Sequence, residues 1–295
     1  MKIAILCQCH KNAEQVNRLI KSMQYNDVFD FYIHVDKKSN ISNGILKNDH
    51  VFVLSNENCV NVLWGDISQV TATLKMIECA KKKKYDYYWL LSGQDFPIKS
   101  PKYIVEFLEK DTNKNYINLF EGEKHKKTDF KRNEIYYCKF LRKRGLLSKL
   151  IKRLYIEITG GWEKTYPLFK RKSIENLQVN FFFGSSWWCL NGRTIEWMMK
   201  YIEKNPNYVK FYRNTLCPDE SFFQTLFMNS PFKDSKMEYL TYVDWSSGKS
   251  NPRILTLEDK DNIFASDFLI ARKFDAEIDE DIIEELEMKI ARETV

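Results

Sequence analysis

The stretch YYWLLSGQDFPIKS, residues 87–100, decides how this chain folds. Tyr87 to Leu91 is an unbroken aromatic and aliphatic run, which is typical of a strand buried on both faces inside a helix-covered sheet. Ser92 and Gly93 end the run, and Asp95 follows just beyond its carboxyl end. In open α/β sheets ligands bind at this edge, which favours a role for Asp95 in binding a polar ligand. Aspartates in turns also bind backbone N–H groups, so a purely local role is the alternative.

The first 60 residues predict a parallel, right-handed start to the sheet. Lys2 to Cys9 and Phe31 to Val35 are apolar strands, and residues 13–23 between them carry apolar side chains at helical spacing. Asp36 directly follows the second strand, a position that commonly holds a nucleotide ribose or base. No glycine-rich dinucleotide fingerprint and no GxxxxGK[ST] motif is present, which argues against a classical NAD site and a P-loop.

The remaining pattern alternates helices and strands. Helices are predicted at 68–83, 101–110, 194–204, 221–228 and 257–264, with an acidic helix at the end of the chain. Strands are predicted at 116–119, at 181–190 with a Gly-Ser-Ser break, at 240–243 and from Arg253 onward. The fold class is therefore α/β, with a mostly parallel central sheet flanked by helices, in one domain covering 1–295.

Composition indicates a globular chain with ample core, because hydrophobic residues make up 44% and charged residues 29%. The 7 cysteines lack regular spacing, which predicts reduced thiols and a cytoplasmic protein. The short apolar start does not resemble a signal peptide, and no run of about 18 apolar residues is present.

The net charge of +6 is concentrated in one segment. Residues 124–172 hold 16 basic and 4 acidic residues, a local net charge of +12, and interrupt the α/β pattern as an insertion. Within it, LLSKLIKRLYIEI (146–158) predicts an amphipathic helix that either docks on an anionic membrane, at the inner face of the cell membrane, or packs on the domain. No nucleic-acid-binding motif accompanies the charge, and the remainder of the chain is acidic, so nucleic acid is not an expected partner.

Cys217-Pro218-Asp219-Glu220 begins a helix near the predicted ligand edge. Glu220 is therefore either a functional carboxylate or a first-turn glutamate that offsets the helix dipole.

Several motifs, in this order, resemble the core-2/I-branching β-1,6-N-acetylglucosaminyltransferases, a family that also includes peptide xylosyltransferases. The matching stretches cover nearly the whole chain outside the basic insertion: IHVDKKS (33–39), VLWGDISQVTATL (62–74), LLSGQDFPIKS (90–100), FGSSWWCL (183–190), CPDESFFQTL (217–226), YVDW (242–245), PRILTLED (252–259) and ARKFD (271–275).

The resemblance implies a GT-A fold and an inverting transfer from a UDP-sugar to a glycan or lipid-linked glycan, with no metal and no other cofactor. N-acetylglucosamine is the first candidate for the transferred sugar, with xylose and glucose as alternatives. Manganese-dependent GT-A enzymes carry Asp-x-Asp where this chain has Ser92-Gly93-Gln94-Asp95, with a single carboxylate.

The resemblance also implies roles for individual residues. Glu220 matches the catalytic base, Asp36 the uridine contact, and Arg253 and Lys273 the two cations on the diphosphate. Trp245 matches an aromatic residue stacked on the acceptor sugar, and Glu134 is a weaker match to an acceptor-binding glutamate. His10 is expected to be a turn residue at a strand end, with a role in donor binding as the alternative.

Two other functions remain as alternatives. A catalytically inactive carbohydrate-binding homologue would be indicated by loss of Glu220, Arg253 or Lys273, and all three are present. A retaining transferase or hydrolase is disfavoured, because no second carboxylate is evident as a partner for Glu220.

Overall fold

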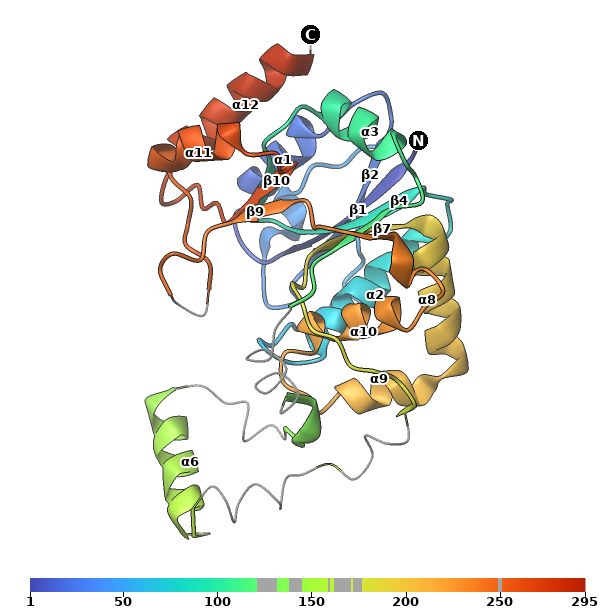
Figure 1. The fold of residues 1–295 in the computed structure, drawn as a ribbon. Helices are drawn as coiled ribbons and strands as arrows, with labels where there is room; N and C mark the ends of the chain where they lie inside the picture. Colours follow the sequence, from blue (N-terminus) through green and yellow to red (C-terminus); the bar gives the residue numbers. More distant parts are fainter. Residues whose placement is uncertain are drawn as a thin grey trace.

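The structure, a computed structural model, describes residues 1–120, 132–137, 145–158, 160–161, 171, 177–248 and 251–294. Most of the predicted basic insertion at 124–172 lies outside these residues. The described part is an α/β fold in which helices cover both faces of a central sheet (Figure 1).

The central sheet has seven strands in the order β3-β2-β1-β4-β7-β6-β8. Its first four strands are parallel, as the sequence predicts, and β7 is antiparallel to both of its neighbours. The strands are β1 (Ile3–Cys9), β2 (Phe29–Val35), β3 (Val51–Val53), β4 (Tyr87–Ser92), β6 (Asn115–Ile117), β7 (Trp188–Asn191) and β8 (Lys236–Met237).

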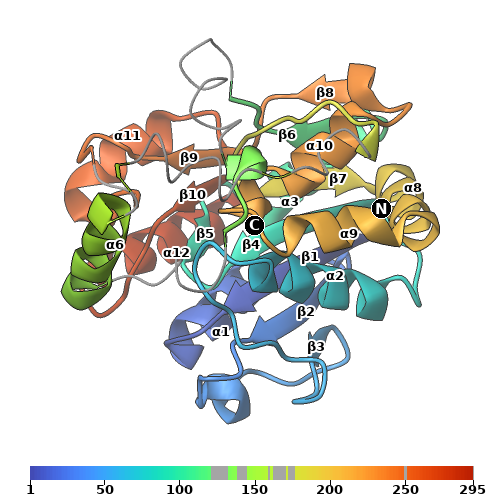
Figure 2. The ribbon, with the colours of Figure 1, turned by 90° about the horizontal axis from the view of Figure 1, so that it is seen from below.

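The sheet separates two apolar layers because successive side chains of a strand point to opposite faces. In β4, Trp89 packs into the layer under α1 (Ala13–Ser22), while Leu90 packs into the layer under α2 (Ser68–Ala80). The first layer also holds α3 (Pro101–Glu109), α11 (Lys260–Ala265) and α12 (Asp281–Thr294), and the second holds α8 (Gly192–Lys204), α9 (Pro206–Tyr212) and α10 (Phe222–Met228) (Figure 2).

A second, three-stranded sheet lies at the carboxyl ends of the central strands, and the sequence pattern did not predict it. Its order is β5 (Asp95–Pro97), β10 (Ile270–Arg272) and β9 (Thr241–Val243). In the antiparallel register of β5 and β10, Arg272 is opposite Asp95. The chain therefore continues from the central strand β4 into a strand that pairs with the C-terminal region.

The strand predicted from Arg253 onward is wrong, and the strand predicted at 181–190 is confirmed only at its end, in β7. Residues 181–187 are irregular, because their backbone groups bond to side chains such as Thr225 and Asn118 instead of to a neighbouring strand. The segment from Arg253 forms isolated backbone bonds to Asp244 and Lys273, and a capping box at Thr256 then turns it into the 3-10 helix η5 (Leu257–Asp259). The other short helices are η1 (Ile41–Gly44), η3 (Pro218–Glu220) and η4 (Lys233–Ser235).

Polar side chains cap several helix ends. Asn12 caps α1 by accepting a hydrogen bond from the Gln15 N–H at 2.9 Å, and Ser100 caps α3 in the same way through Tyr103. The six cysteines among the described residues form no disulfide bond with one another, in line with the prediction from their spacing. Within the described part of the chain, none of the helices is both long and apolar enough to cross a bilayer.

Gly184 provides a test of how tightly the irregular segment packs. A Cβ at this position would lie 1.8 Å from the backbone oxygen of Asn118, so Gly184→Ala must displace backbone. We expect the free energy of unfolding to fall by about 1–3 kcal/mol, the usual cost of overpacking. Denaturant unfolding measures this, with Gly44→Ala as the control, because there the new methyl group meets only the Ala13 side chain. Equal stability of Gly184→Ala and the wild type would contradict the packing described.

Candidate active site

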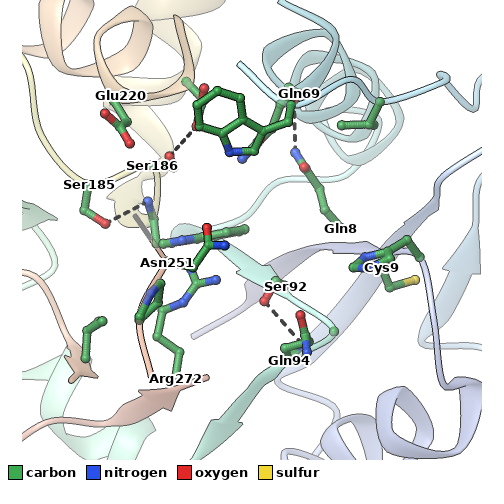
Figure 3. Close-up of a pocket in the computed structure, with 18 of the residues that line it drawn as sticks. Gln8, Cys9, Gln69, Ser92, Gln94, Ser185, Ser186, Glu220, Asn251 and Arg272 are labelled. Atoms are coloured by element: carbon green, nitrogen blue, oxygen red, sulfur yellow. Dashed lines mark hydrogen bonds between the residues drawn. The ribbon is translucent and has the colours of Figure 1, made fainter. Parts of the chain in front are cut away.

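A cavity of about 450 Å³ opens at the carboxyl ends of β1, β2 and β4 (Figure 3). Loops from the second half of the chain close its other side. The lining therefore combines residues that follow the parallel strands with residues around β7, η3 and β9: Gln8, Cys9, His10, His34, Asp36, Ser92, Gly93, Gln94, Ser185, Ser186, Trp187, Asp219, Glu220, Val243, Trp245, Asn251 and Arg272 among others. This is the edge at which the sequence predicted a ligand.

Asp95 lies beneath the floor of this cavity and is completely buried. Its carboxylate accepts hydrogen bonds from the backbone N–H and the hydroxyl of Ser92, both at 2.8 Å, and lies 3.5 Å from Nε of Arg272. Burial raises the pKa of Asp95, an effect that Arg272 opposes. Asp95 thus binds the turn, as the local alternative proposed, and in addition pairs with a cation that does reach the cavity.

Of the described residues that line the cavity, Arg272 is one of two with a cationic side chain, and the other, Lys11, is ion-paired with Asp275. The Arg272 side chain is only 9% exposed, and its guanidinium stacks 4.1 Å from the Trp187 ring. Among the described residues neither Nη1 nor Nε has a hydrogen-bond acceptor, and leaving such a buried donor unsatisfied costs about 1–3 kcal/mol. Figure 3 shows the side chain extending from its strand into the cavity. A ligand with anionic oxygens would satisfy these donors.

Lys273 follows Arg272 and is half-buried, but it is not among the residues that line the cavity. Burial lowers its pKa, and so does the adjacent positive charge of Arg272. Its amino group forms no ion pair with a carboxylate of the described residues. Lys273 and Arg272 are thus adjacent cations that both interact with the buried Asp95, and of the two only Arg272 lines the cavity.

Glu220 lines the opposite side of the cavity at the end of η3. Its backbone oxygen accepts a hydrogen bond from the Gly184 N–H at 2.8 Å, and its carboxylate pairs with Arg132. The preceding Asp219 is also in the wall, where it accepts a hydrogen bond of 2.6 Å from the Ser186 hydroxyl. Burial raises the pKa of Asp219. Of the two neighbouring carboxylates, Asp219 therefore holds the loop, while Glu220 faces the cavity (Figure 3).

The side of the cavity near β1 and β2 is lined by Asp36 and two histidines. Asp36 is 8% exposed and accepts a hydrogen bond from the Lys38 N–H at 3.0 Å, so its carboxylate is held in the turn after β2. His34 accepts the Val60 N–H at 2.8 Å, and burial lowers the pKa of this ring and of His10. Both rings therefore favour their neutral forms, and the positive charge of this region comes from Lys11, which lines the cavity, and from Lys38, which pairs with Asp36 at 3.5 Å.

Exposed aromatic side chains surround the mouth of the cavity. Trp245 is 55% exposed and Trp64 is 50% exposed, and Phe120 lies beside the same opening. Large apolar side chains gathered on one surface mark ligand-binding grooves. Glu134 is not among the lining residues, although Arg132 two positions earlier reaches Glu220.

Arg253 is bound within the loop region instead of lining the cavity. Its guanidinium donates hydrogen bonds to Asp244 at 2.6 and 2.8 Å and to Asp259 at 2.9 Å. Hydrogen bonds from Ser246 together with Arg253 lower the pKa of Asp244 to about 2. This clamp fixes the chain on both sides of Trp245 and Pro252, which do line the cavity.

Comparison with known proteins identifies the family. The model of the Core-2/I-Branching enzyme family matches residues 3–265. The chain belongs to the Core-2/I-Branching enzyme family. Curated relatives include a xylosyltransferase of Ciona intestinalis and xylosyltransferase 1 of Homo sapiens, each 27% identical over 98% and 97% of this chain. The chain spans about a third of the length of these relatives, 34% and 30% respectively. The α/β architecture agrees with the GT-A-like fold expected of a Core-2/I-Branching enzyme.

Measured against the expectations for this family, the structure brings Asp36, Glu220 and Trp245 to one cavity. Asp95, Arg253, Lys273 and Glu134 lie outside its lining. Arg272 and Trp64 were not singled out from the sequence, although both lie within the family motifs, next to Lys273 and within VLWGD. Arg132 carried no sequence signal beyond its nearness to Glu134. Across the described residues, no cluster of three or more His, Cys, Asp or Glu side chains is arranged to hold a metal ion.

Proposed function

We propose that this Core-2/I-Branching enzyme transfers a sugar from a UDP-sugar to a hydroxyl group of a free or lipid-linked glycan, with inversion and without a metal ion. The observation that carries this proposal is the polarity of the cavity: a buried guanidinium with unsatisfied donors lies on one side and the Glu220 carboxylate on another. The family match and the names of the relatives support a glycosyltransferase.

In the proposed reaction, Glu220 takes the proton of the acceptor hydroxyl while the oxygen of that hydroxyl bonds to the anomeric carbon of the donor sugar. The bond from that carbon to the diphosphate breaks in the same step, and UDP leaves with the electron pair. Negative charge therefore grows on the diphosphate, which is best stabilised by cations already in place. In this proposal Arg272 supplies such a charge from the cavity wall, its neighbour Lys273 adds a second, and Asp36 would contact the uridine on the far side of the donor.

Two sugars are the main candidates for the group that is transferred. The resemblance of the motifs put N-acetylglucosamine first, whereas the relatives named as xylosyltransferases favour xylose. The aromatic mouth formed by Trp245 and Trp64 suits an acceptor sugar, because its ring faces are apolar and its edges polar. Glu134 and Arg253 keep their predicted roles at the acceptor and the diphosphate as parts of this proposal.

A panel of UDP-sugars tests the function directly. We expect UDP release from one of UDP-xylose, UDP-N-acetylglucosamine and UDP-glucose, measured by chromatography, and the rate should be the same in excess EDTA. The physical reason is that fixed cations take the place of a metal at the diphosphate. UDP binding without any release would favour the inactive carbohydrate-binding homologue, and a rate lost in EDTA and restored by manganese would contradict metal independence.

Glu220→Gln tests the catalytic base. Glutamine keeps the shape and can still accept a hydrogen bond from Arg132, but it does not take a proton at neutral pH. We expect turnover to fall roughly 100-fold or more while UDP affinity stays close to that of the wild type. The matched control is Glu258→Gln, because Glu258 is an exposed first-turn acid of η5. Equal activity of both variants would leave Glu220 with only a helix-dipole role.

The variants Arg272→Lys and Arg253→Lys test which of the two arginines contributes more to binding the diphosphate of UDP. Lysine keeps the charge in each case but has neither the planar stack on Trp187 nor the several N–H donors of arginine. We expect Arg272→Lys to weaken UDP binding roughly 10-fold or more, the worth of one hydrogen bond to a charged group. Arg253→Lys should weaken it less, because Asp244 and Asp259 already occupy that guanidinium. Calorimetric titration with UDP measures both, and the reverse order would assign the diphosphate to Arg253.

A further inference from the structure

The helix α6 (Leu146–Ile158) exposes its apolar side chains, and no residue of the helix is buried. Leu146 and Ile158 are 88% and 83% exposed, Leu147 is 71% exposed and Leu150 is 55% exposed. Figure 1 shows α6 standing apart from the layers around the sheet. The alternative drawn from the sequence, a helix packed on the domain through its apolar face, is therefore not what the structure shows.

The apolar stripe of α6 is exposed, whereas a surface helix of a globular domain normally buries it. Within the helix, the partly covered side chains are Ser148, Lys152 and Ile156, which are spaced four residues apart and so share one face. The stripe formed by Leu146, Leu150 and Leu154 lies on a different face and is exposed. A surface helix normally turns its apolar stripe toward the core. Here the apolar stripe is available to something outside the chain.

The charge on α6 indicates what that partner is. Lys149, Lys152 and Arg153 lie on the polar half of the helix, and the only acid, Glu157, forms an ion pair with Arg153 at 3.2 Å. In the sequence, residues 139–153 contain seven basic residues and no acidic residue. A partner must therefore offer an apolar layer next to negative charge.

We propose that α6 binds the surface of an anionic lipid bilayer, with its leucine and isoleucine side chains in the region between headgroups and acyl chains. A helix with an apolar face and basic residues on the other side is the usual form of such interfacial elements. A second copy of the chain fits less well, because two basic helices would repel each other. A nucleic acid would pair with the charges but would leave the apolar stripe in water.

Vesicle flotation tests the proposal with the whole chain. The wild type should float with vesicles that contain anionic phosphatidylserine and remain at the bottom with purely phosphatidylcholine vesicles. Added salt should reduce flotation, because it screens the lysine and arginine charges. Changing Lys149, Lys152 and Arg153 together to Glu should lower the partition coefficient roughly 100-fold or more, since each basic residue near such a surface contributes about fivefold.

Two further variants separate the apolar contribution from the charge. Changing Leu147, Leu150 and Leu154 together to Ser keeps the charge and should also abolish flotation. Changing Lys21, Lys82 and Lys110 together to Glu alters the net charge by the same amount at exposed positions away from α6 and should leave flotation unchanged. Circular dichroism and UDP binding confirm that each variant is folded.

The outcomes are decisive. The proposal is overturned if the wild type stays with the soluble fraction on anionic vesicles at low salt, or if the serine variant floats like the wild type. It is also overturned if sedimentation shows a dimer that the serine variant loses while no lipid binding occurs, because a second copy would then cover α6. Loss of flotation in both α6 variants and not in the control establishes the docking surface.

Discussion

The contact between Asp95 and Arg272 is the constraint on which the site depends. Both side chains are buried, and a charge taken out of water is costly unless it is paired and hydrogen-bonded. Ser92 satisfies part of Asp95 through two hydrogen bonds, and Arg272 neutralises it from the neighbouring strand. The pair therefore joins the end of the central strand β4 to the small sheet. Among the described residues, Nη1 of Arg272 is left without an acceptor, and because Arg272 lines the cavity, an anionic ligand there would satisfy it.

The charged side chains of the cavity lie on or beside loops that contacts within the protein hold in place. Gly184 and Ser186 fix the loop that carries Asp219 and Glu220, and the clamp of Arg253 with two aspartates fixes the chain around Trp245. Charges held in this way need little rearrangement when the reaction moves negative charge onto the leaving group, which is the basis of electrostatic preorganisation. Positive charge and the proposed base come from different segments of the chain, which fits a donor and an acceptor that enter from different sides.

In α6 the sequence pattern did not determine how the helix is placed. Both α6 and α1 have an amphipathic sequence, yet of the two only α1 buries its apolar face. Hydrophobic periodicity predicts that a helix has an apolar face, but it does not say what covers that face. The exposed orientation is therefore information that the sequence pattern could not supply, and it distinguishes a docking element from a packing element.

By itself, the sequence determined what is encoded locally. Apolar runs and helical spacing placed the parallel strands and most helices, and the motif around Glu220 identified a carboxylate that lines the cavity. Only the tertiary structure decided which basic residue of Ala271-Arg272-Lys273 faces the ligand. Adjacent residues of a strand point to opposite sides, so a shift of one residue in register exchanges them. That register is set by pairing β10 with β5, two segments far apart in the chain, and no local pattern reports such a pairing.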